Sequence, residues 1–264
     1  MTLEEHFGLT QAPFPKTAAD AALLRHPGLE EVLHGLRCAL TRDTIALLVA
    51  ESGCGKSTVL SLFARSLDAA SYHVLFTSFT TLKSFGFLSL LCVATGLRPR
   101  RFKGETACAL IAQLRGLPKR TILLVDEAHE LPDDSLEDLR LLSADDFDRK
   151  SPFALILAGQ PLLRERLAEP PHYALSQRLG VRLRLRPLSE SEVPLFLDRH
   201  LKAAGLKKSC FDPDAVAVIF HHSRGIPRLV QNIALAAMTA AMTAGKKIVD
   251  APAVQQAVVD LEAP

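Results

Sequence analysis

Short apolar runs alternate with longer segments of helical spacing over the first two thirds of the chain. The short runs occupy residues 45–50, 73–77, 121–125 and 153–158, a length typical of buried strands. Residues 27–40 instead carry leucine or valine at 29, 32, 33, 36 and 40, which is the spacing of one helix face. This alternation predicts an α/β domain in which a parallel sheet is covered by helices on both faces.

The pattern changes after Pro187, where the apolar positions all follow a helical period. Three helix starts are recognisable there: Ser189 with Glu192, Asp212 with Pro213, and Asp250 with Pro252. The first 25 residues have no clear periodicity, which predicts an irregular segment lying over the main domain. We therefore expect an N-terminal extension (1–26), an α/β core (27–187) and a small all-helical domain (188–264).

The composition favours a folded protein with almost no net charge. Of the 264 residues, 48% are hydrophobic, which is enough for one substantial core and a smaller second one. The formal net charge is only +2, so binding to nucleic acid would have to come from local positive patches.

Cysteine usage and the N-terminus favour the cytoplasm. The cysteines, at 38, 54, 92, 108 and 210, form no C-x-x-C pair and no metal-ligand array, so we interpret them as reduced thiols. Glu4 and Glu5 stand where a secretory signal would carry basic residues. Because no apolar run approaches the roughly 20 residues that span a bilayer, we expect a soluble cytoplasmic protein with no membrane partner.

Residues 50–57 match the phosphate-loop pattern G-x-x-x-x-G-K-[ST] except at Ala50. In such a loop, glycines let the backbone approach the phosphates, the lysine reaches the β and γ phosphates, and the hydroxyl holds Mg²⁺. Alanine suits the first position if the turn needs no positive φ there. The expected ATP-binding residues of this loop are Ala50, Glu51, Ser52, Gly53, Cys54, Gly55, Lys56, Ser57 and Thr58.

The apolar run at 121–125 ends in Asp126 and Glu127. Neighbouring parallel strands end along one edge of a sheet, so these carboxylates are expected beside the phosphate loop. We expect Asp126, with Ser57, to orient Mg²⁺ or its waters, and Glu127 to polarise the water that attacks the γ-phosphorus. Loop and acid pair together predict a P-loop ATPase that uses ATP and Mg²⁺.

Two further polar residues follow strand ends. Gln160 comes after the run at 153–158 and could reach between the carboxylates and the γ-phosphate, although it could also be an ordinary strand-end glutamine. His129, two positions after Glu127, could line the site or steer Glu127 between rotamers. A surface histidine is an equally good interpretation.

Several segments together resemble the ExeA-like AAA+ ATPases over nearly the whole chain. They are VDEAHEL at 125–131, LEDLRLLS at 136–143, LAGQPLL at 157–163, FGL at 7–9 with PF at 13–14, and SRGIPR at 223–228. The resemblance implies an AAA+ core followed by a helical lid. The family contains secretion-associated membrane ATPases and ATPase helpers of DNA transposition of the TnsC, TniB and MuB type.

The resemblance also implies two arginines that contact nucleotide. Arg178 in LSQRL matches the arginine that enters the neighbouring subunit's site, with Arg182 as the alternative. Arg228 in GIPR matches the lid arginine that touches nucleotide in its own subunit, with Arg224 as the alternative. An always-charged planar guanidinium suits either role. If Arg178 acts in trans, hydrolysis requires a head-to-tail homo-oligomer, either a ring or a helical filament.

The transposition branch is the expected one, because the sequence given shows neither the membrane span nor the cell-wall-binding domain of the secretion branch. The implied partners are duplex DNA, a transposase and a target-selection protein. The alternative is a regulatory or assembly ATPase that acts on protein partners without DNA. A replication-initiator loader is less favoured, because such proteins usually add a winged-helix DNA reader.

A group of basic and hydroxyl residues is the candidate DNA surface. The candidates are Thr81, Lys83, Arg98, Arg100, Arg101, Lys103 and Lys119, with Thr80 and Arg120 beside them. Lysine and arginine contacts to phosphate predict binding that weakens steeply with salt and has little sequence preference. A solvated basic loop is the alternative. Arg182, Arg184 and Arg186 alternate with apolar residues, so structural or intersubunit roles are favoured for them.

Overall fold

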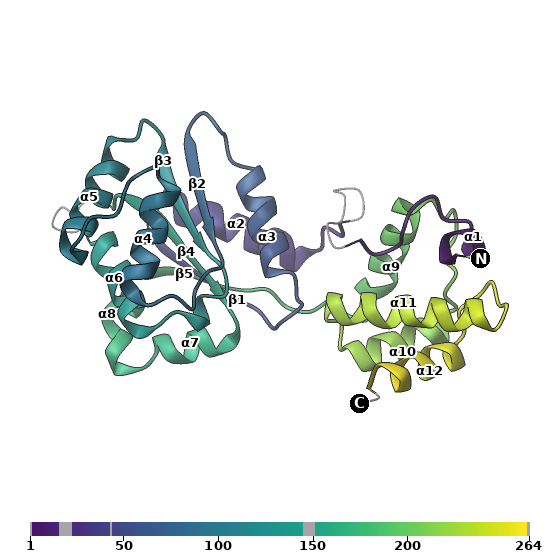
Figure 1. The fold of residues 1–264 in the computed structure, drawn as a ribbon. Coiled ribbons are helices and arrows are strands. Elements are labelled where there is room, and N and C mark those ends of the chain that lie inside the picture. The colour runs from purple at the N-terminus through teal and green to yellow at the C-terminus, as the bar shows by residue number, and fades with distance from the viewer. Residues whose placement is uncertain (1, 16–22, 43, 145–150, 263–264) are drawn as a thin grey trace. The chain divides into compact units, whose positions relative to one another are not determined.

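The computed structural model describes residues 2–15, 23–42, 44–144 and 151–262 (Figure 1). The chain forms two compact units, one of Gly28–Leu185 and one that combines Met1–Pro27 with Arg186–Pro264. We call the first the α/β unit and the second the lid unit.

The α/β unit is built on a sheet of parallel strands in the order β2-β3-β4-β1-β5. The strands are β1 (Ile45–Val49), β2 (Tyr72–Thr77), β3 (Arg120–Val125), β4 (Phe153–Gly159) and β5 (Leu179–Arg184). The first four confirm the apolar runs expected from the sequence. β1 and β4 are buried along their whole length, because helices cover both of their faces.

Helices cover the sheet on two sides. They are α2 (Pro27–Thr41), α3 (Lys56–Arg65), α4 (Ser84–Ala94), α5 (Lys103–Gly116), α6 (Asp133–Ser143), α7 (Pro161–Leu167) and α8 (Tyr173–Gln177), with 3₁₀ turns η1 (Ala128–Glu130) and η2 (Pro170–His172). Figure 1 shows α2 and α3 on one face, and α4 and α6 on the other. Alternate residues of the strands, such as Leu47, Leu123 and Leu155, pack with α4 to α8 in one apolar cluster. This architecture confirms the predicted α/β class.

Strand order decides where the chemistry lies. β4 hydrogen-bonds to both β1 and β3, so its end lies between the phosphate loop that follows β1 and the acid pair that follows β3. Ala50 N donates to Gly159 O at 3.1 Å, which ties the start of the loop to the end of β4. Carboxyl ends of parallel strands around such a switch in strand order are the usual ligand crevice of this architecture.

The lid unit is helical, as predicted from the period after Pro187. It contains α9 (Glu192–Ala203), α10 (Pro213–Ser223), α11 (Pro227–Thr243) and α12 (Ala251–Glu262), together with the short α1 (Leu3–Phe7). Asp212 accepts a hydrogen bond from Ala215 N at 2.6 Å, so it caps α10 as its sequence context indicates. Arg186 bonds to Glu192 and lowers the pKa of that carboxyl to about 2.

The described residues of the N-terminal segment pack with the lid helices, whereas the sequence prediction assigned this segment to the main domain. His6 Nε2 contacts Lys246 O at 2.8 Å, and Thr10 N donates to Ala204 O at 2.8 Å. Phe7 and Leu9 belong to the same buried cluster as the apolar residues of α9 to α12. Helical periodicity carries no information about which unit a short irregular segment will contact, so only the tertiary contacts reveal this.

Candidate functional site

The phosphate loop has the backbone conformation that its sequence requires. Gly53 has a φ of +83° and Gly55, which precedes α3, a φ of +95°, and glycine adopts such values without steric cost. The described non-glycine residues with positive φ are Phe14, Glu127 and Arg224. Ala50 is not among them, so its departure from the glycine pattern leaves the turn unstrained.

Lys56 and Ser57 begin α3 and point to the carboxyl edge of the sheet. The Lys56 side chain is buried, and its Nζ donates to Ala50 O at 3.3 Å. Ser57 Oγ donates to Asp126 Oδ2 at 2.5 Å. A hydroxyl and a carboxylate oxygen held this close fit the hard oxygen ligands that Mg²⁺ takes beside water and phosphate oxygens. The structure therefore brings the two predicted metal-binding residues together.

Glu127 has a strained backbone beside the lysine. Its φ of +50° is uncommon for a residue other than glycine, and Glu127 N donates to Asp126 Oδ1 at 2.9 Å. Glu127 Oε1 lies 4.0 Å from Lys56 Nζ, and the side chain is 40% exposed. Glu127 Oε2 is buried and has no hydrogen-bond partner among the described residues. One carboxylate oxygen therefore faces the lysine, and the other is not hydrogen-bonded.

His129 is buried, so the surface interpretation is wrong. Its side chain is 6% exposed, and Nδ1 lies 3.3 Å from Glu127 Oε2. Gln160 N donates to the same Nδ1 at 3.5 Å, while Nε2 lies 3.3 Å from Glu130 Oε1. The histidine ring thus stands between the acid pair and the start of α7.

Gln160 lies where the sequence interpretation requires it, at the end of the strand between β1 and β3. It precedes Pro161 at the start of α7, and its side chain is half-buried. The preceding Gly159 has little room for a larger side chain, because a Cβ would lie 3.2 Å from His129 N. The sheet therefore brings Lys56, Asp126, Glu127 and Gln160 to one edge.

Cys54 is a buried residue of the phosphate loop. Burial, followed by the nearby Glu51 carboxylate, raises the pKa of its thiol. The thiol therefore stays protonated at neutral pH and serves as a small apolar group under the loop.

The candidate arginines occupy different environments. Arg178 is half-buried after α8, and its guanidinium donates to Arg140 O at 3.1 Å and Ser143 O at 3.2 Å, both in the last turn of α6. Arg182 is exposed on β5 and donates to Ser176 O at 3.0 Å. Arg178 is thus docked on its own subunit's helix end, whereas Arg182 projects from an edge strand.

Arg228 and Arg224 both belong to the lid unit. Arg228 is the second residue of α11 and is exposed. Arg224 follows α10 with a φ of +50°, and Gly225 beside it could not be replaced, because a Cβ would lie 1.9 Å from Leu188 O. This turn holds both arginines at the junction of α10 and α11.

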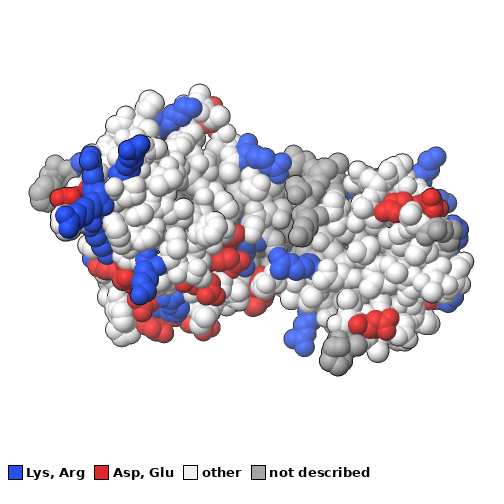
Figure 2. Space-filling model, viewed as in Figure 1, with Lys and Arg blue, Asp and Glu red and all other residues white. Residues whose placement is uncertain are grey.

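Most of the basic candidates gather at the starts of α4 and α5. Asp138 of α6 accepts a hydrogen bond from Ser84 Oγ and forms a 2.7 Å ion pair with Lys103 Nζ, so the two helices begin side by side. The residues exposed there are Thr81, Lys83, Arg98, Arg100, Arg101 and Lys103, which we call the α4/α5 basic surface. Figure 2 shows blue side chains over α5 and its flanking loops. Thr80, by contrast, is buried.

Lys119 lies apart from this surface. It follows the far end of α5, a helix of 14 residues and therefore about 20 Å long. Lys119 Nζ donates to Ala69 O at 2.7 Å, and Arg120 begins β3. The structure thus separates these two basic residues from the other candidates.

A network that sequence reasoning missed lies behind the acid pair. Arg166 of α7 donates to His129 O at 2.5 Å and to Leu131 O at 2.9 Å. Asp133 Oδ1 accepts from Arg166 Nη2 at 2.5 Å and contacts His172 Nε2 at 2.9 Å. Because these contacts join residues more than 30 positions apart, no local pattern could have identified them.

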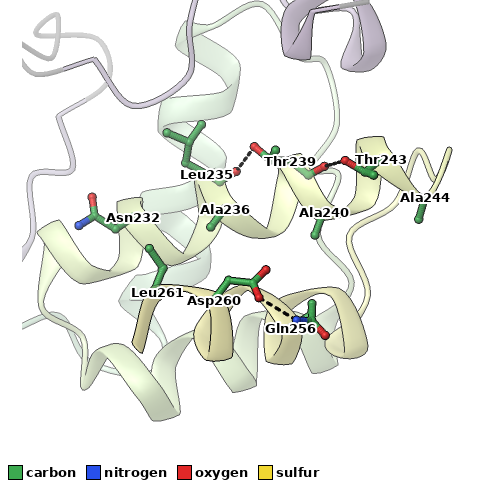
Figure 3. A pocket seen from close by; sticks show the side chains of 10 residues that line it. All are labelled: Asn232, Leu235, Ala236, Thr239, Ala240, Thr243, Ala244, Gln256, Asp260 and Leu261. Atoms are coloured by element: carbon green, nitrogen blue, oxygen red, sulfur yellow. Dashed lines mark hydrogen bonds between the residues drawn. The ribbon is translucent and has the colours of Figure 1, made fainter. Parts of the chain in front are cut away.

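The lid unit contains a groove of about 740 Å³ between α11 and α12 (Figure 3). Its walls are mostly alanine, threonine and leucine, including Ala236, Ala240 and Leu261. Several of its polar groups bond within their own helices, as in the 2.8 Å bond from Gln256 Nε2 to Asp260 Oδ1. None of the described residues that line the groove is a lysine or an arginine that could bind a phosphate.

Comparison with known proteins agrees with this geometry. Residues 39–167 match the family model of an AAA domain. General secretion pathway protein A of Aeromonas hydrophila is 31% identical over 248 residues, which cover 91% of this chain and 45% of that protein. The chain thus spans less than half of this relative. The match confirms the homology to ExeA-type ATPases expected from the sequence.

Solved structures show the same fold at low identity. Cdc6p from Pyrobaculum aerophilum has a TM-score of 0.71 at 18% identity, covering 97% of this chain and 70% of that one. The Aeropyrum pernix ORC1 protein, solved in complex with DNA, has a TM-score of 0.70 at 20% identity, covering 94% and 68%. None of the described helices is both long enough and apolar enough to cross a bilayer. The chain therefore contains an AAA domain over residues 39–167 and has the P-loop AAA+ fold of these solved structures.

Proposed function

We propose that this protein binds ATP with Mg²⁺ and hydrolyses it. The observation that supports this proposal best is the convergence of the phosphate loop and the acid pair, through the 2.5 Å contact between Ser57 and Asp126. Lys56 would bind the β and γ phosphates, Ser57 and Asp126 would hold the metal, and Glu127 would take a proton from the attacking water. Mg²⁺, when bound with ATP, neutralises phosphate charge. Release of phosphate from ATP, which should be strongly reduced in Glu127→Gln, tests the proposal.

The working species in this proposal is a head-to-tail oligomer. Arg178 would leave the α6 carbonyl groups and enter the neighbouring subunit's site, while Arg228 would contact nucleotide within its own subunit. Gln160 would report the γ-phosphate to α7, the helix that it precedes. The two arginine roles are carried over from the sequence resemblance, and the role of Gln160 is inferred from its position after β4. The exposed or half-buried positions of all three side chains are compatible with these roles.

We also propose that the assembled protein binds duplex DNA through the α4/α5 basic surface. Basic side chains clustered on one face attract phosphates without reading bases. Arg101 lies 5.5 Å above the ring of Phe102, which is 59% exposed, so an aromatic group stands among the cations. The ORC1 structure, which has the same fold, was solved with DNA, which supports this assignment by analogy.

A second candidate function is an assembly ATPase that acts on protein partners. The 31% identity to general secretion pathway protein A, over 91% of this chain, favours it. In that case the α4/α5 basic surface would be a solvated face, and nucleotide would not change binding to DNA.

A gel-shift assay with duplex DNA separates the two functions. DNA is mixed with the wild-type protein and ATP, with ADP, and with Glu127→Gln and ATP. The DNA proposal predicts binding with ATP, weaker binding with ADP, and the most persistent complex with Glu127→Gln. Lys83→Ala combined with Arg101→Ala should weaken DNA binding and should reduce the slope of log affinity against log salt concentration by about two. Lys119→Ala should leave the affinity and the slope unchanged. Equal and weak binding in every nucleotide state would favour the protein-partner function.

On the same resemblance we propose that the DNA-bound assembly recruits a transposase, with a target-selection protein as a further partner. A helper of this kind marks the target by its own nucleotide-dependent DNA binding. Failure of the gel-shift result at low salt would therefore exclude the transposition role together with DNA binding.

A further inference from the structure

Glu127 depends on its surroundings to hold its conformation. Its φ lies in the left-handed region, which is strained for a residue other than glycine and persists only where surrounding contacts hold it. The turn that follows is held locally by Glu130 N donating to Glu127 O at 2.9 Å and by Leu131 N donating to Ala128 O at 3.2 Å. These two bonds close a single 3₁₀ turn, which is a weak unit by itself.

Arg166 fixes this turn from outside. Its Nη1 donates to His129 O at 2.5 Å, and its Nη2 donates to Leu131 O at 2.9 Å, so one guanidinium holds carbonyl groups on both sides of Glu130. The planar fork of arginine suits two fixed acceptors, because little freedom is lost for the second bond. The turn that carries Glu127 and His129 is thus attached to α7.

Asp133 and His172 in turn hold the guanidinium. The hydrogen bond from Arg166, with a smaller contribution from His172, lowers the pKa of the Asp133 carboxyl, so Asp133 is ionised at neutral pH. His172 is buried and contacts the same oxygen as Arg166. Three hydrogen bonds, to His129 O, Leu131 O and Asp133 Oδ1, therefore restrain the Arg166 guanidinium.

We infer that Arg166 is a positioning residue for Glu127, because its guanidinium locks the turn that sets the direction of the Glu127 carboxylate. Arg166 lies on α7, the helix that follows Gln160. His172 immediately precedes α8, and Arg178 immediately follows α8. The network thus connects the end of β4, the acid pair and the segment that carries Arg178. The inference rests on the proposed hydrolytic role of Glu127.

The first test uses no nucleotide. Hydrogen–deuterium exchange compares wild type, Arg166→Ala and Arg164→Ala, since Arg164 is an exposed arginine of the same helix. Exchange in the peptide that contains Glu130 and Leu131 should be about tenfold faster in Arg166→Ala and unchanged in Arg164→Ala. Unchanged exchange in that peptide, or faster exchange over the whole α/β unit, would overturn the inference.

The second test measures turnover. Arg166→Ala should lower kcat by about 10- to 100-fold, because misplacement of a catalytic group has effects of this size, while KM and the affinity for a fluorescent ATP analogue change less than about twofold. Arg166→Lys, which retains one donor to the turn, should recover part of kcat. Loss of ATP affinity in parallel with kcat, or a kcat equal to that of Arg164→Ala, would contradict a positioning role.

A double variant separates this inference from the proposed function. If Arg166 acts through Glu127, adding Arg166→Ala to Glu127→Gln should not lower the residual turnover further. Additive losses would show an independent role for Arg166 and overturn the inference. Wild-type turnover by Glu127→Gln alone would instead refute the role of Glu127, and the exchange measurement would still decide whether Arg166 holds the turn.

Discussion

Ser57 Oγ donates a hydrogen bond of 2.5 Å to Asp126 Oδ2, although 69 positions separate the two residues in the chain. Ser57 is the second residue of α3, the helix after the phosphate loop, and Asp126 follows the strand β3, which does not pair with β1. The contact therefore reaches across the end of β4. A triphosphate on the loop would meet the hydroxyl, the carboxylate and the lysine at the same point.

Lys56→Ala should weaken ATP binding by about 30-fold or more. Losing a buried charged partner of a phosphate costs about 2 kcal/mol at least, which corresponds to that factor. Equilibrium titration with a fluorescent ATP analogue measures the change, and Lys207→Ala, an exposed lysine of the lid unit, is the control. Equal affinities of the two variants would refute the role of Lys56.

Glu127→Gln should keep nucleotide affinity within about twofold and lower turnover by about 10²- to 10⁴-fold, because the amide retains the shape of the side chain but cannot accept the water's proton. Phosphate release under saturating ATP measures this. Glu130→Gln, an exposed acid of the same turn, should keep wild-type turnover. A similar loss in both variants would mean that turnover depends on the conformation of the turn and not on the Glu127 carboxylate.

Arg178→Ala should lower the rate of ATP hydrolysis by about 10³-fold or more, while each subunit still binds nucleotide. Mixing Arg178→Ala with Lys56→Ala subunits should restore part of the activity, because Lys56→Ala supplies Arg178 to a neighbour whose phosphate loop is intact. Steady-state ATPase measured against the mixing ratio reports this. Arg182→Ala, in the same assay, should need no complementation.

Two results would change the role that we assign to Arg178. Mixtures that stay as inactive as the separate variants would place the action of Arg178 within its own subunit, consistent with its bonds to Arg140 O and Ser143 O. Loss of hydrolysis in Arg182→Ala, with recovery on mixing, would identify Arg182 as the residue that acts in trans. Melting curves of Arg178→Ala would show how much the α6 end depends on those bonds.

Burial of His200 should make the lid unit sensitive to acid. Burial lowers the pKa of this histidine to about 4 from an ordinary value near 6.5, and its Nδ1 has no hydrogen-bond partner among the described residues. Its ring lies 4.5 Å from Phe196 and 5.3 Å from Phe14 between centroids, so a charged imidazolium would sit among aromatic groups.

The sign follows from proton binding. Between about pH 6.5 and pH 4, His200 binds a proton in the unfolded chain but not in the folded chain. The stability that depends on a neutral His200 is therefore fully present above pH 6.5 and is lost as the pH falls toward 4. The loss amounts to about 3 kcal/mol of unfolding free energy. Urea denaturation of wild type and His200→Phe at pH 7 and pH 4 measures it, and the difference between the two proteins should change by this amount. Parallel behaviour would show that His200 does not cause the sensitivity.

Local patterns were sufficient for much of the molecule. The apolar runs predicted four strands within one residue at each end, and Asp212 with Pro213 predicted the start of α10, because a side-chain cap and a fixed φ act over a few residues. The phosphate-loop pattern and the acidic strand end likewise identified the loop glycines, Lys56, Ser57, Asp126 and Glu127 as candidate site residues. The roles of these residues in hydrolysis remain predictions.

The sequence by itself determined the elements, the class of fold and the identity of the candidate nucleotide site, since periodicity, capping and phosphate-loop chemistry are properties of neighbouring residues. Only the tertiary structure decided that β4 lies between β1 and β3, that the N-terminal segment packs with the lid helices, that His129 is buried and that Lys119 is separated from the other basic candidates. It also revealed Arg166 behind the acid pair. These outcomes depend on which distant surfaces bury one another, and the energy of such packing is shared among many contacts that no short segment contains.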